Sequence, residues 1–190
     1  MTILGEGPAV PESAFTDLTP QSAPAGSRRV MESTRQRLGF LPATVARLAA
    51  SPHTLEAFMR ISAAFEATSL EPQARETVVF TVATRNRCHV CVAMHTRKLR
   101  ALRADEALIA ALREARPLPD ERLEAVRVFT LRVLDRAGDI GEEALEAFAA
   151  HGYTPEQALE VVLGIGAYTL STLANRLTGA PVDAELEACA

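Results

Sequence analysis

One stretch decides how this chain folds: residues 76–95, ETVVFTVATRNRCHVCVAMH. Its second half contains a Cys-x-x-Cys pair, Cys88 and Cys91, and His95 follows one helical turn later. These side chains recur at steps of three and four residues, so a helix would place them on one face. A helix beginning near Cys88 would hold that thiol at its amino-terminal end, where unpaired backbone amides favour a thiolate. The spacing therefore predicts a redox dithiol with His95 beside it as a proton carrier.

Glu76 opens the same stretch, and the residues that follow it, 77–83, are apolar or β-branched almost throughout. Such a run could form a strand, but its neighbours have helical patterns and no partner strand is in sight, so we predict a helix. A carboxylate in these surroundings is costly to bury unless it is paired. The thiols and His95 are the expected partners, and a structural ion pair with Arg75 or Arg87 is the alternative. The polar residues 85–87 would let the second helix fold back on the first.

The positions of Glu76, Cys88, Cys91 and His95 resemble the signature of the AhpD-like alkylhydroperoxidases, in the carboxymuconolactone decarboxylase superfamily. The resemblance runs from about residue 30 to 183 and includes the closing segment NRLTGAPVD, residues 175–183. It implies an AhpD-like helical bundle, a homo-oligomer, and attack on peroxide by Cys91 with Cys88 as the resolving thiol. The best-known members carry a His directly before the second Cys. Here that position is Val90, and His89 comes one residue earlier.

The length and composition of the chain limit the number of domains and the classes of function to consider. A chain of 190 residues with 48% hydrophobic residues predicts one domain with a substantial core. A net charge of −4 gives a nucleic-acid role no electrostatic support. We find no secretory pattern near residue 1 and expect no membrane-spanning run, which predicts a cytoplasmic setting. Thiols stay reduced there, so a Cys-x-x-Cys pair indicates catalysis or metal binding.

The predicted architecture is an all-α, single-domain bundle of about eight or nine helices. An extended arm over residues 1–26, anchored by Phe15 and Leu18, precedes a helical domain over 27–183 and a tail over 184–190. Capping and breaker residues place the helices at about 27–38, 42–50, 52–67, 72–85, 88–102, 105–114, 120–136, 142–150 and 155–177. The similar segments 72–79 and 155–162 suggest either an old helical duplication or chance.

The function predicted from this pattern is a thiol-dependent peroxidase that reduces organic or hydrogen peroxides through Cys88 and Cys91, assisted by His95 and Glu76. An external dithiol, of lipoyl or thioredoxin type, would regenerate it, and no cofactor is predicted. One alternative is a disulfide reductase that uses the same pair. Another is a zinc-stabilised binding protein with these four residues as ligands. Decarboxylation of a lactone, suggested by the superfamily name, is disfavoured because that chemistry needs no dithiol.

The remaining candidate side chains carry weaker signals. His89 is adjacent to the thiols but is expected to project to another side. Cys189 is expected to be an incidental exposed thiol. Tyr168 is expected in the core, and His53 and His151 at the surface or at helix caps.

Overall fold

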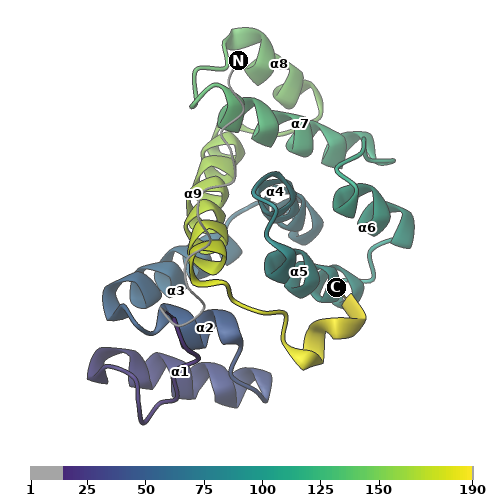
Figure 1. Ribbon diagram of the computed structural model, residues 1–190. Coiled ribbons are helices and arrows are strands. Elements are labelled where there is room, and N and C mark those ends of the chain that lie inside the picture. Colours follow the sequence, from purple (N-terminus) through teal and green to yellow (C-terminus); the bar gives the residue numbers. More distant parts are fainter. Residues whose placement is uncertain (1–14, 190) are drawn as a thin grey trace, which may run out of the picture.

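The central helix of the molecule is α4 (Pro72–Arg85), which carries Glu76. Pro72 begins it, and every residue from 76 to 83 is buried. A helix that is apolar all round must be covered on all sides. Four helices cover it, α5 (His89–Ala101), α6 (Glu106–Arg113), α7 (Glu121–Asp135) and α9 (Pro155–Thr178), as Figure 1 shows. The β-branched run is therefore a helix, as predicted.

The computed structural model describes residues 15–189, and within that range the chain forms nine α-helices, one 3-10 helix and no strand. The other elements are α1 (Ala25–Leu38), α2 (Ala43–Leu48), α3 (Pro52–Glu66), α8 (Glu142–Ala150) and the 3-10 helix η2 (Ala184–Cys189). The predicted all-α class is confirmed. Helices α1, α2 and α3 form a separate layer beside α9, with its own core of Met31, Val45, Leu48 and Leu55.

Most predicted helix starts are confirmed by their caps. Ser51 accepts a hydrogen bond from the Thr54 amide ahead of α3, and Thr154 forms the expected capping box with Gln157 ahead of α9. The cap predicted at Ser27 is wrong, because α1 begins two residues earlier, after Pro24. Ser27 lies inside this helix, fully buried, and its hydroxyl donates to the Ala49 carbonyl at 2.8 Å.

Helix α9 corrects the expectation that no apolar run is long enough to span a membrane. By length and composition its 24 residues pass that test. Figure 1 shows why it is so apolar: it runs through the domain, packed against α3, α4 and α7. At Gly164 the helices approach so closely that an added Cβ would lie 2.5 Å from the Phe65 ring. These contacts are those of a core helix.

The two ends of the predicted domain are described in part. Residues 1–14, most of the predicted arm, lie outside the described residues, and Leu18 packs against the core of α1, α2 and α3. The predicted tail forms η2, which packs on α5 through the buried Leu186. Cys189, expected to be an exposed thiol, is half-buried, and Arg113 at the end of α6 donates to its carbonyl at 2.6 Å. The domain limits and the internal duplication stay predictions.

Candidate functional site: a buried dithiol beside a carboxylate–imidazole pair

A tight turn between α4 and α5 sets the position of the thiols. Arg87 adopts a left-handed backbone conformation, with φ of 52°, and the next amide, that of Cys88, donates to the Ala83 carbonyl at 2.9 Å. The chain thereby reverses, and α5 packs against α4. Cys88 is the N-cap residue of α5, so the predicted place of this thiol at the helix tip is confirmed.

The two sulfur atoms face each other in a buried site. Cys88 Sγ and Cys91 Sγ lie 3.1 Å apart, close enough for an S–H···S hydrogen bond, and each residue is 2% exposed. Helix α9 covers them with polar groups that sequence reasoning missed. Asn175 Nδ2 lies 3.3 Å from Cys91 Sγ and 4.0 Å from Cys88 Sγ, and Ser171 Oγ lies 4.0 Å from Cys91 Sγ. Both thiols are free.

The two thiols differ in acidity. The hydrogen bond with Cys91 lowers the pKa of Cys88 to about 6, against the opposing effect of burial, and the Asn175 amide and the charge of Arg176 add to the lowering. The same hydrogen bond, together with burial and the Cys88 charge, raises the pKa of Cys91. The reduced pair therefore carries one negative charge, on Cys88, and one proton, on Cys91.

Glu76 and His95 form the second half of the site. Glu76 Oε2 lies 2.6 Å from His95 Nδ1, and the two residues are 1% and 8% exposed. Because Nδ1 faces the carboxylate, the other ring nitrogen, Nε2, is left for other partners. His95 follows Cys91 by four residues on α5, a spacing that brings the two Cβ atoms to about 5–6 Å. Of the expected partners of Glu76, His95 is confirmed. The thiols are not, because the two sulfurs contact each other, Ser171 and Asn175 and not the carboxylate.

Lys98 is a further partner of Glu76 that sequence reasoning missed. Its Nζ lies 2.7 Å from Glu76 Oε1 and also contacts Glu66. Burial acts to raise the pKa of Glu76, but His95 and Lys98 outweigh it and lower that pKa. The alternative partners do not contact Glu76: Arg75 pairs with Glu66 at 3.7 Å, and Arg87 lies at the turn before α5.

Tyr168 lies on α9, one helical turn before Ser171, and covers the His95 side of the site. Its ring meets the His95 ring edge to face, with centroids 5.1 Å apart. The residue is buried, as predicted, and burial raises the pKa of its phenol to about 12. Helix α9 thus contacts α5 at two levels: Tyr168 meets His95, and Asn175, two turns later, meets Cys91.

A surface pocket of about 360 Å³ reaches the helix tip at Cys88. His89 lines this pocket, so it is closer to the site than expected, although it projects outward and is exposed. The full lining is Arg87, Cys88, His89, Val90, Asn175, Arg176, Gly179 and Ala180. Cys88, and not Cys91, is the thiol that an external molecule can approach by this route.

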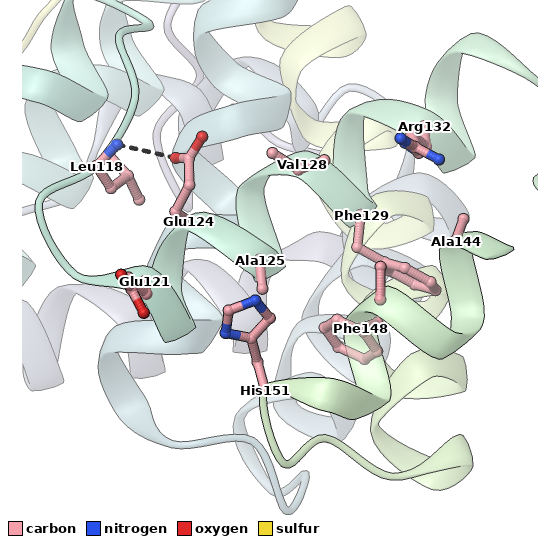
Figure 2. A pocket seen from close by; sticks show the side chains of 11 residues that line it. Leu118, Glu121, Glu124, Ala125, Val128, Phe129, Arg132, Ala144, Phe148 and His151 are labelled. Carbon is pink, nitrogen blue, oxygen red and sulfur yellow. Dashed lines mark hydrogen bonds between the residues drawn. The ribbon is translucent and has the colours of Figure 1, made fainter.

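A separate pocket, of about 270 Å³, lies between α7 and α8 and is shown in Figure 2. Its floor is formed by Phe129 and Phe148, whose rings stack at 4.2 Å, and Glu124 at one side accepts a hydrogen bond from the Leu118 amide at 2.8 Å. His151, the C-cap residue of α8 as predicted, lies at its edge. None of the predicted site residues lines it.

The four predicted site residues form two pairs joined by α5. Within residues 15–189, no three His, Cys, Asp or Glu side chains are grouped so that they could hold a metal ion. The four-ligand zinc site that the sequence left open therefore has no geometric basis. The site therefore consists of two buried thiols, one of them acidic, and a buried carboxylate hydrogen-bonded to an imidazole, all held in a helical domain.

Comparisons with known proteins agree with a helical domain of this kind. Residues 52–130, which include all four predicted site residues, match the model of the carboxymuconolactone decarboxylase family. These residues therefore resemble a carboxymuconolactone decarboxylase family domain. Among curated proteins, no match was found.

Solved structures share the fold along nearly the whole chain. An uncharacterised peroxidase-related protein from Ralstonia eutropha, described as an alkylhydroperoxidase AhpD core, has a TM-score of 0.81 and 23% identity, over 94% of this chain and 96% of its own. A second peroxidase-related protein, from a Silicibacter species, has a TM-score of 0.75 and 21% identity, over 96% and 97%. The debrominase Bmp8, in complex with 2,3,4-tribromopyrrole, has a TM-score of 0.71 and 18% identity, over 93% and 95%. These similarities establish the AhpD-like fold.

Proposed function

We propose that this protein is a thiol-dependent peroxidase that reduces organic or hydrogen peroxides through Cys88 and Cys91. The observation that carries the proposal is the buried pair of sulfurs 3.1 Å apart, one of them acidic, beside the Glu76–His95 pair. A thiolate that attacks a peroxide becomes a sulfenic acid, and a second thiol within reach converts it to a disulfide. The two sulfur atoms of Cys88 and Cys91 are already close enough to form a disulfide bond without a large movement of the backbone.

The proposed first step is attack by Cys91, the order that the family resemblance implies. Cys91 holds the proton of the reduced pair, so this proton must leave before attack. His95 lies one turn away on the same helix, and its bond to Glu76 holds one ring nitrogen and leaves the other for the proton. The Cys91 sulfur then takes the distal oxygen, the O–O bond breaks, and the proton goes to the departing alkoxide.

The second step closes the disulfide. The Cys88 thiolate attacks the Cys91 sulfenic sulfur, the S–O bond breaks, and hydroxide leaves as water after it takes a proton. An external dithiol, of lipoyl or thioredoxin type, returns two electrons and two protons. The sum is one peroxide and one dithiol converted to one alcohol, one water and one disulfide.

Thiol titration tests this proposal. We expect one equivalent of peroxide to remove two of the three thiols of the wild-type protein, and the dithiol to restore them. Cys88→Ser should stop at a sulfenic acid, and Cys91→Ser should lose peroxide turnover. Unchanged turnover in Cys91→Ser would refute the proposed order and the role of the pair.

A disulfide reductase that uses the same pair is the second candidate, favoured by the open pocket at Cys88. Comparing the rate of oxidation by a peroxide with that by a small disulfide separates the two functions. The similarity to a debrominase makes 2,3,4-tribromopyrrole a third substrate to include, because loss of bromide would indicate a different use of the dithiol.

We also propose that the protein is a homo-oligomer that associates through α9. Four apolar side chains on this helix are exposed although they recur at helical spacing: Leu159, Val162, Leu173 and Leu177. A cavity of about 620 Å³ runs beside them, lined from α7 and α9 by apolar side chains and glycines with Thr169. Contiguous apolar surface of this kind marks an interaction site. Light scattering measures the molar mass of the wild type and of Leu173→Glu. We expect an oligomer for the wild type and a monomer for the variant.

A further inference from the structure

The pocket that reaches Cys88 has a one-sided charge. Two arginines, Arg87 and Arg176, and one histidine, His89, line it, and its lining contains no aspartate or glutamate. The chain as a whole has a net charge of −4. The positive character is therefore a local property of the entrance to the thiols.

These two arginines have no carboxylate partner among the described residues. In the part of the chain that the structure describes, some surface arginines pair with acids, among them Arg60 with Glu56 at 2.6 Å and Arg100 with Glu106 at 3.0 Å, and others, such as Arg97, do not. Arg87 and Arg176 make no such pair within residues 15–189. Arg176 donates to the Asn86 carbonyl at 2.7 Å, and this bond holds the guanidinium at the pocket rim, where no carboxylate pairs with it.

We propose that this pocket binds the reductant, and that the reductant is a low-molecular-weight thiol with an anionic group, such as a carboxylate, sulfonate or phosphate, close to its sulfur, in place of the lipoyl or thioredoxin-type dithiol that the family resemblance implies. The inference rests on the proposed function in that it takes the Cys88–Cys91 disulfide as a state of the cycle. A volume of about 360 Å³ falls at the small end of small-molecule sites, which favours a small thiol over a thioredoxin-like protein. Guanidinium groups are well suited to pair with carboxylate, sulfonate or phosphate.

The redox step follows from this placement. The thiolate of the reductant attacks Cys88 Sγ, the S–S bond breaks, and Cys91 leaves with the electron pair and takes a proton, which its raised pKa favours. A second thiol, on the same or another reductant molecule, attacks the reductant sulfur of the mixed disulfide and releases the Cys88 thiolate. Two thiols thus give two electrons and leave as a disulfide.

Three thiols that share a two-carbon chain test the charge requirement: 2-mercaptoethanesulfonate, 2-mercaptoethanol and cysteamine. The protein disulfide is prepared with diamide, so the assay does not depend on peroxide turnover. Rates of disulfide reduction are compared per thiolate, which removes the effect of the different thiol pKa values. We expect the anionic thiol to react about tenfold faster than the neutral one and the cationic thiol to be slowest, with the spread shrinking at about 1 M salt.

Variants show whether the two arginines cause the preference. Arg87→Asn removes the charge, and asparagine tolerates the left-handed backbone there. Combined with Arg176→Gln, it should bring the three rates within about twofold. Arg176→Lys keeps the charge, so the anionic thiol should still react fastest and the cationic thiol slowest. Arg97→Gln, an exposed arginine farther along α5, is the control for net charge and should change nothing.

Equal per-thiolate rates in the wild type would overturn the inference, as would a charge order that survives in the double variant. The circular dichroism spectrum and melting temperature of each variant show whether it is folded. If peroxide turnover is absent while the charge order holds, the peroxidase proposal fails and the anionic-thiol site stands.

Discussion

Glu76 Oε2 lies 2.6 Å from His95 Nδ1, although the two residues are 19 positions apart and belong to different helices. The contact exists because the turn at Arg87 folds α5 back on α4. It fixes the imidazole with Nδ1 toward the carboxylate and leaves Nε2 for other partners.

Glu76→Gln should lower kcat/KM for peroxide by about 10- to 100-fold, because the neutral amide no longer stabilises the imidazolium that forms when Cys91 loses its proton. Steady-state peroxide turnover measures this effect. Glu71→Gln is the matched control, since Glu71 caps the same helix and its carboxylate pairs only at the surface, with Arg122 at 3.3 Å. Equal losses in the two variants would show that Glu76 acts through stability alone.

Asn175→Ala should raise the pKa of the Cys88 thiol by about one unit from its value of about 6, because the thiolate loses an amide hydrogen bond. The ultraviolet absorbance of the thiolate, titrated between pH 4 and 9, measures the midpoint. Ser171→Ala is the control, because its hydroxyl contacts Cys91 and not Cys88. A midpoint that stays near 6 in Asn175→Ala would contradict the assigned contact.

Lys98→Met should destabilise the fold by about 1–2 kcal/mol at neutral pH. Removing one partner of a fully buried ion pair costs about 3–5 kcal/mol. The cost is smaller here because the Lys98 side chain is 37% exposed and Glu76 keeps His95. Lys98→Arg keeps the charge and serves as the control.

The pH dependence of that difference follows from the two pKa shifts. The Glu76 pKa is lowered in the fold, so the contribution of the pair is complete above the ordinary value of 4.5 and is lost as pH falls further. The Lys98 pKa is raised, so the contribution is complete below the ordinary value of 10.5 and is lost as pH rises through the raised value. Chemical denaturation of wild type and Lys98→Met should differ most between these limits and converge outside them.

The sequence was sufficient to predict the central pair of helices, the closeness of the two thiols and the contact between Glu76 and His95, because local spacing decides them. Cys88, Cys91 and His95 share one helix, and the polar break before them indicates the reversal. The same spacing argument could have identified Lys98 as a partner of Glu76, since Lys98 lies three residues after His95 and contacts the same α4 side chain. Its role depends on how far a long side chain bends back, which spacing alone does not fix.

Asn175 and Ser171 were beyond sequence reasoning for a different reason. They lie 80 to 87 residues from the cysteines, and only the packing of α9 against α4 brings them to the sulfurs. No local pattern marks them, because a polar side chain on an amphipathic helix ordinarily faces water. The same limit explains Ser27, which reads as a helix cap but is buried against α2.

The packing of α9 gives the last prediction, on two glycines one half-turn apart. A Cβ at Gly164 would lie 2.5 Å from the Phe65 ring and 3.0 Å from Val78, both fully buried, so Gly164→Ala should destabilise the fold by about 1–3 kcal/mol or more. At Gly166 the nearest atom within reach is Ile61 Cδ1, at 4.0 Å, so Gly166→Ala meets no clash and should stabilise the helix by up to about 1 kcal/mol. Thermal unfolding of the two variants should therefore shift in opposite directions. Because α9 carries Asn175, Gly164→Ala should also raise the pKa of the Cys88 thiol, and the thiolate titration measures this change. A destabilised variant with an unchanged thiol pKa would show that the packing of α9 at Gly164 does not control the electrostatics of the site.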